Sequence, residues 1–141
     1  MKKEENYELI EKIIISIDSI YEITKLDYLE ISVFSTNEKL IDNIKVILIN
    51  ISQFAKKIDF DLFDNKDLKF LNKLVGFDKY SHSKLSNKKN IYNLIYSREL
   101  ALINIRLLEI QNEKFGKSIN KVELVLMKKI NKNMKFTFKT M

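Results

Sequence analysis

The stretch STNEKLIDNIKVILINISQFAKKI, residues 35–58, decides the fold of this chain. It opens with the spacing of a capping box, in which the side chains of Ser35 and Glu38 accept hydrogen bonds from free backbone N–H groups at the start of a helix. Apolar residues then recur at three and four positions, the period of an α-helix. Val46 and Ile49 lie outside that apolar stripe, which predicts a central helix buried nearly all round. The stripe itself comprises Leu40, Ile41, Ile44, Ile47, Leu48, Ile51, Phe54 and Ala55.

A long amphipathic helix is predicted before this stretch, over residues 7–34. Residues 25–27 mark a break, and residues 30–34 alternate polar and apolar side chains in the manner of a β-strand. Helix is therefore predicted for the first part, with a strand as the alternative at its end. The predicted core positions are Ile10, Ile13, Ile14, Ile17, Ile20 and Tyr21.

A brief third helix is predicted after a cap at Asp64, with the apolar residues Leu68, Phe70, Leu71, Leu74 and Val75. Asp64 precedes Asp67 by three residues, which is the spacing of an N-cap aspartate. Gly76 follows the last apolar residue, where it can adopt the left-handed turn that ends many helices. Residues 77–90 contain four lysines and no sustained apolar period, so an exposed basic loop is predicted there.

One further helix is predicted over residues 88–115, ending at Gly116. Its Leu/Ile face, which includes Leu102 and Leu108, is predicted to lie in the core. The remaining residues allow two structures. A last helix capped by Ser118 would turn Ile119, Val122, Leu126 and Ile130 inward. The alternative is a β-hairpin with a turn at residues 131–133 and strands containing Val122, Leu124, Leu126, Phe136 and Phe138.

Length predicts a single domain over residues 1–141, and the helical periods and caps predict an all-α bundle of about four to five helices. The apolar fraction of 45% is enough to build a core. Lysine, isoleucine and asparagine number 23, 21 and 14, whereas arginine numbers two. We interpret this bias as the product of an AT-rich coding sequence, which accounts for part of the basic charge.

Several classes of chemistry lack the residues they require. There is no cysteine, so disulfides, thiolate metal sites and cysteine nucleophiles are excluded. His82 is the only histidine, and it lies in the predicted basic loop. Gly76 and Gly116 are forty residues apart, so no glycine-rich phosphate loop exists. The sequence therefore predicts a protein that is not an enzyme, with no catalytic residue, no cofactor and no small-molecule substrate.

The acidic cluster Asp59, Asp61, Asp64 and Asp67 does not follow the spacing of a calcium loop, and no metal site is predicted. Helix capping and a solvated surface explain these aspartates. The uncharged residues 46–55 are about half as long as a membrane-spanning helix. No membrane contact is predicted, and the acidic residues near the N-terminus favour a cytoplasmic location over export.

Charge is distributed unevenly along the chain. Residues 1–70 have a net charge of −4, and residues 71–141 have a net charge of +10. This asymmetry indicates an electrostatic partner. Lysines at this density can neutralise backbone phosphates without reading a base sequence. The predicted phosphate-contacting residues are Lys84, Lys88, Lys89, Lys114, Lys117, Lys121, Lys128, Lys132 and Lys135.

These observations predict a small non-catalytic subunit or binding protein of a larger nucleoprotein assembly. It would contact the backbone of RNA or DNA through its basic C-terminal half. The alternative is a protein–protein interaction module, such as an inhibitor, adaptor or chaperone, that docks a basic partner through its acidic N-terminal half.

Overall fold

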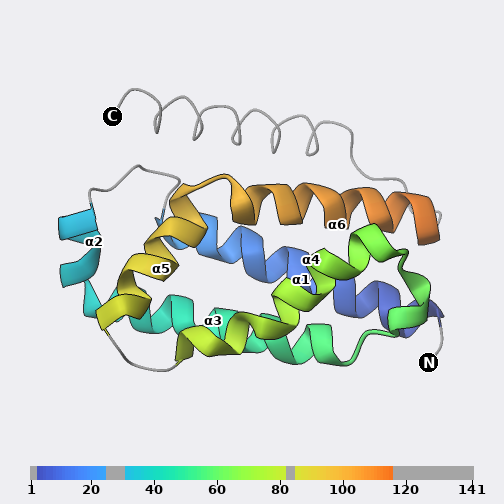
Figure 1. Cartoon of the computed structure of the whole chain (residues 1–141), viewed down its shortest axis with the longest axis horizontal. Helices are drawn as coiled ribbons and strands as arrows, with labels where there is room; N and C mark the ends of the chain where they lie inside the picture. Colours follow the sequence, from blue (N-terminus) through green and yellow to red (C-terminus); the bar gives the residue numbers. More distant parts are fainter. Residues whose placement is uncertain (1–2, 25–30, 82–84, 116–141) are drawn as a thin grey trace.

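The computed structural model describes residues 3–24, 31–81 and 85–115, and these residues form helices without any strand. The predicted all-α class is confirmed, and Figure 1 shows the long helices packed as a bundle with the short α2 at one end. Both structures predicted for the C-terminal residues lie outside the described part. The α-helices are α1 (Lys3–Thr24), α2 (Ile31–Thr36), α3 (Glu38–Lys56), α4 (Asn65–Val75), α5 (Leu85–Tyr96) and α6 (Glu99–Phe115), and the 3-10 helices are η1 (Phe60–Leu62) and η2 (Gly76–Ser81).

Helix α3 is central to the bundle, as predicted. It packs against α1, α4 and η2, and its Ile44 and Leu48 are fully buried. Val46, on another side of the helix, is 57% exposed. The prediction that α3 is buried nearly all round is therefore wrong, because its neighbours cover only part of its circumference.

Helix α1 packs against both α3 and α6. Asp59, which follows α3, donates its backbone N–H to Oδ1 of Asn6 near the start of α1 over 2.9 Å, so α1 and α3 run antiparallel. On the other side, the Asn104 amide of α6 donates to the Asp18 carboxylate over 2.9 Å. All six core positions predicted for α1 are buried.

Helix α3 is capped by Asn37 and not by Ser35 as predicted. Residues 31–36 are already helical in α2, so the strand alternative for this segment is also wrong. Asn37 is the first residue to leave helical backbone angles, and its side-chain oxygen accepts the N–H of Leu40 over 3.1 Å. A side chain can cap a helix only where the backbone is not itself helical.

Replacing Asn37 by Ala is expected to lower the free energy of unfolding by about 1 kcal/mol, because an N–H in the first turn of α3 loses its acceptor. The control variant Ser35→Ala removes a smaller polar side chain two residues away and leaves the cap intact. Urea unfolding of both variants measures the difference. A larger loss in Ser35→Ala than in Asn37→Ala would contradict this assignment of the cap.

The predicted ends of α4 are confirmed, but the conformation predicted for Gly76 is wrong. Asp64 accepts the N–H of Asp67 over 2.9 Å at the start of the helix. Gly76 follows the helix with φ −79° and ψ 0°, which is right-handed, and η2 begins there. A Cβ on Gly76 would meet no atom within 4 Å, so this position does not require glycine.

The segment predicted as an exposed basic loop, residues 77–90, is largely helical. Within η2, Phe77 and Tyr80 are buried, and their rings contact edge to face with centroids 5.9 Å apart. A 3-10 helix brings residues three apart onto one side, and two aromatic residues do not form a sustained α-helical period. Helix α5 then begins at Leu85.

The helix predicted over residues 88–115 is divided into α5 and α6, so the described residues contain six α-helices. The break falls at Ser97, whose hydroxyl accepts the N–H of Glu99 over 3.3 Å. A break of this kind resets the helical phase, and the inward face of α6 is rotated from the predicted one. Leu108 is buried as predicted, but Leu102 is 40% exposed and its predicted burial is wrong.

Aromatic side chains attach α2 to α5. Phe34 is fully buried and contacts Tyr92 and Tyr96 with ring centroids 5.5 and 6.0 Å apart. Both contacts are edge to face, which is a favoured geometry for aromatic pairs. A helix of only six residues has little stability of its own, so these contacts hold α2 in place.

Candidate interaction surface

Three of the nine lysines predicted to contact phosphates lie in the described part of the chain. Lys88, Lys89 and Lys114 belong to the described residues. Lys89 and Lys114 are exposed, and neither forms an ion pair within the part that the structure describes. The other predicted contact residues lie outside the described part: Lys84, Lys117, Lys121, Lys128, Lys132 and Lys135.

Lys88 is committed to an internal contact. Its Nζ donates to the Glu38 carboxylate over 2.9 Å and to the backbone carbonyl of Ser35 over 3.3 Å. The hydrogen bond from Lys88 holds the pKa of Glu38 below its ordinary value. The lysine therefore joins α5 to the junction of α2 and α3, and its charge is shared with a carboxylate.

Other cations of the bundle are paired in the same way. Lys73 of α4 lies 2.7 Å from the Glu99 carboxylate at the start of α6, and Lys56 of α3 lies 3.1 Å from Asp78 in η2. Such exposed pairs contribute little to stability, typically below about 1 kcal/mol. These pairs matter for binding, because each of them lowers the positive charge that the surface offers to a partner.

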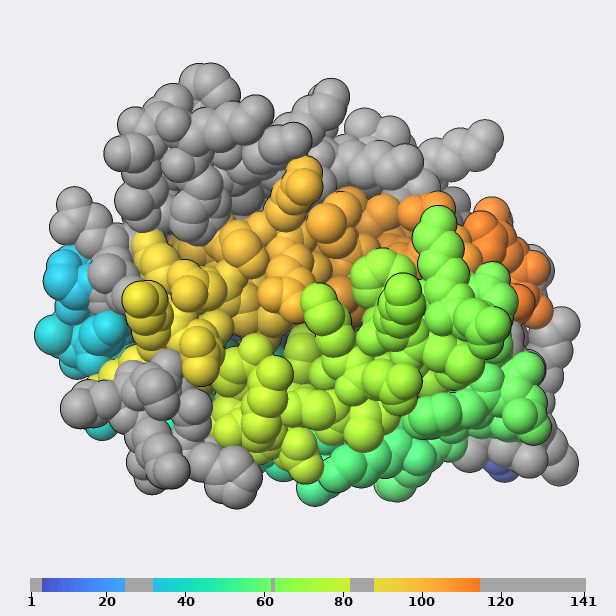
Figure 2. Space-filling model, in the orientation of Figure 1, coloured from blue at the N-terminus to red at the C-terminus, as the bar shows by residue number. Residues whose placement is uncertain are grey.

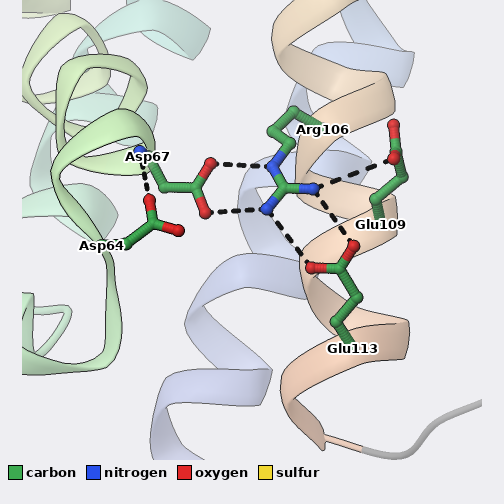
Figure 3. A network of polar contacts seen from close by, with 5 residues as sticks. All are labelled: Asp64, Asp67, Arg106, Glu109 and Glu113. Carbon is green, nitrogen blue, oxygen red and sulfur yellow. Dashed lines mark hydrogen bonds and ion pairs between the residues drawn. The ribbon is translucent and has the colours of Figure 1, made fainter.

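The strongest polar contact joins α4 to α6. Asp67 is 1% exposed, and its two carboxylate oxygens accept hydrogen bonds from Nε and a terminal nitrogen of Arg106 over 2.7 and 2.8 Å. Figure 3 shows this parallel arrangement, with Glu109 and Glu113 on the other side of the guanidinium group at 3.8 and 3.3 Å. Figure 2 shows α4 and α6 lying side by side on one face of the molecule.

Local structure places Asp67 for this contact. The Asp64 carboxylate accepts the backbone N–H of Asp67, which fixes the first turn of α4. Its side chain then points across to α6, where the hydrogen bonds from Arg106 hold its pKa below the ordinary value. Both oxygens are occupied and shielded from solvent, so this carboxylate is a structural group and not an accessible base or metal ligand.

The interpretation of Asp67 as a capping or solvated residue is therefore wrong. The pairing of Arg106 with Glu109 and Glu113 follows from helical spacing, whereas its contact with Asp67 crosses 39 positions of the sequence. One signal was present, since Arg106 is one of two arginines among 25 basic residues. A guanidinium group binds a carboxylate through two parallel bonds, which lysine cannot do.

No group of three or more potential metal ligands occurs within residues 3–24, 31–81 and 85–115. His82 lies outside this part of the chain. None of the described helices is long and apolar enough to cross a bilayer.

No protein-family model, no curated protein and no solved structure matches this chain.

Proposed function

We propose that this protein is a non-catalytic member of a cytoplasmic nucleoprotein assembly, and that it contacts nucleic-acid backbone through residues 114–141. One observation carries the proposal. Residues 1–115 contain 18 basic and 18 acidic residues, whereas residues 116–141 contain seven lysines and one glutamate. The whole net charge of +6 therefore lies after α6.

The ion pairs of the bundle support this narrower interface. In the basic half of the chain, Lys73, Lys88 and Arg106 are each bound to a carboxylate. Among the described lysines of the predicted interface, Lys89 and Lys114 remain exposed, and Lys114 lies next to the lysine-rich residues. We therefore propose a continuous cationic stretch that begins at Lys114, with Lys88 in a structural role.

The chemistry of such a stretch fits phosphate better than base recognition. A lysine ammonium is a point charge that neutralises a phosphate without a fixed geometry. Arginine is the residue that most often reads bases through two parallel bonds, and of the two arginines in the sequence Arg106 is already bound to Asp67. Binding is therefore proposed to be independent of base sequence.

Replacing Lys121, Lys128 and Lys132 together by Gln is expected to weaken binding to random RNA and DNA alike. If three phosphate contacts are lost, the slope of log K against log salt becomes shallower by about two to three units, because each contact releases nearly one counterion. Fluorescence anisotropy at several salt concentrations measures both the affinity and the slope.

The matched control removes three exposed lysines from the other half of the chain, Lys39, Lys57 and Lys69. It has the same net charge as the first variant, so it separates a local contact from the overall charge of the protein. Equal losses in the two variants, or no binding by the native protein at low salt, would refute the proposed interface.

A further inference from the structure

The solvent-exposed face of α1 carries a row of carboxylates. They recur at three and four positions with Ile15 at the centre, so one face of the helix presents them all. Ile15 is 57% exposed, and Ile23, near the end of the same helix, is 38% exposed. The carboxylates of this α1 face belong to Glu4, Glu8, Glu11, Asp18 and Glu22.

Several acidic groups elsewhere in the bundle are already paired. Glu38, Asp67, Asp78 and Glu99 each have a lysine or arginine partner. The glutamates of the α1 face form no ion pair within the part of the chain that the structure describes. Like charges one turn apart destabilise a helix, so α1 retains a repulsion that a cationic partner would relieve.

The exposed isoleucines are an independent indication of a contact. Lys12 is drawn to the α3 side, where its Nζ lies 5.7 Å from the centre of the Phe54 ring, and it leaves Ile15 uncovered. An apolar centre surrounded by charged groups is the usual composition of a protein interface. Asp18 already accepts the Asn104 amide, so the glutamates and Ile15 form the part available to a partner.

We propose that the α1 face binds the lysine-rich residues 116–141 of a second copy of this chain. The charges are complementary, since that segment has a net charge of +6. Its apolar residues Ile119, Val122, Leu126 and Ile130 recur at three and four positions and can meet Ile15 while the intervening lysines meet the glutamates. The basic partner expected for the acidic half is thus supplied by the protein itself.

The size of this face sets the strength of the contact. A helix of 22 residues is about 33 Å long, and one helix face buries an area at the low end of protein interfaces. Association is therefore weak and reversible, and it falls as salt screens the charges. Each copy has one donor segment and one acceptor face, so reciprocal exchange closes a dimer.

Sedimentation equilibrium of the full chain, free of nucleic acid, tests the proposal. The native protein is expected to form a dimer at about 0.05 M salt and to dissociate by about 0.5 M. Ile15→Asn is expected to reduce the association constant about tenfold or more. Val46→Asn on α3 is the matched control, because Val46 is exposed to the same 57%, and this variant should associate like the native protein.

A mixing experiment identifies the two halves of the contact. Glu8→Gln/Glu11→Gln/Glu22→Gln lacks the acceptor charges, and Lys121→Gln/Lys128→Gln/Lys132→Gln lacks the donor charges. Each variant alone is expected to be monomeric, and an equimolar mixture of the two is expected to form a heterodimer through the one intact contact. Circular dichroism confirms that both variants are folded.

A native protein that stays monomeric at low salt and high concentration would overturn the proposal. Residues 116–141 would then bind α1 of the same copy, or a different protein. Equal loss of association in Ile15→Asn and Val46→Asn, or a mixture of folded variants that stays monomeric, would do so too. None of these outcomes bears on phosphate binding, because nucleic acid is absent from the experiment.

Discussion

Replacing Leu107 by Ala is expected to lower the free energy of unfolding by about 2–5 kcal/mol, whereas Leu102→Ala is expected to cost less than about 1 kcal/mol. Both residues lie in α6, and the two variants change the same number of atoms and the same helix propensity. They differ in burial, because Leu107 is 2% exposed and Leu102 is 40% exposed. The larger cost reflects the cavity left among the neighbours of Leu107.

Urea unfolding of the two variants at one temperature measures this difference directly. The comparison also tests the break at Ser97, because an uninterrupted helix from α5 into α6 would carry the face containing Leu102 into the core. Comparable costs for the two substitutions would show that the inward face of α6 is assigned incorrectly.

Replacing Asp67 by Ala is expected to cost about 3 kcal/mol, because it leaves the guanidinium of Arg106 partly buried without its main acceptor. Glu113 and Glu109 remain beside Arg106, which places the loss at the lower end for a broken buried pair. The double variant Asp67→Ala/Arg106→Met is expected to be more stable than Asp67→Ala alone, since it removes the unpaired charge as well. If the loss in the double variant equals the sum of the losses in Asp67→Ala and Arg106→Met, the two residues do not form a direct pair.

The same pair predicts a dependence on pH. The pKa of Asp67 is lower in the folded protein than in the unfolded chain, where it is about 3.9. The contribution of the pair is therefore complete above the unfolded pKa and is lost as the pH falls below about 4 through the folded value. Asp67→Asn lacks this component, so its free energy of unfolding should fall less steeply with acid than that of the native protein.

Local patterns predicted much of the fold, and contacts between distant residues account for most of the errors. The period of α1 identified its buried face, and Asp64 identified the start of α4. The break at Ser97 was missed because the apolar spacing continues across it with little change. The cap at Asn37 was misplaced because α2 lends helical structure to Ser35, and α2 itself depends on aromatic contacts with α5.

For the candidate interface too, the sequence predicts one part and contacts between distant residues decide the other. The excess of positive charge after α6 is a property of the sequence and needs no fold. Whether one lysine is available depends on what lies across from it, and Glu38 lies 50 positions before Lys88. The sequence identifies the glutamates of α1 only as part of an acidic half. That Ile15 stays exposed beside them depends on how α3 and α6 pack against α1.

The position of α1 between α3 and α6 has a consequence for folding during synthesis. Its partner on α6 is distant, since the hydrogen bond between Asp18 and Asn104 spans 86 positions. At a translation rate of about 5–20 residues per second, the nascent chain holds one side of α1 uncovered for roughly 4–17 s. During that interval α1 and α3 can pair, and the apolar surface awaiting α6 is open to chaperones or to other nascent chains on the same messenger.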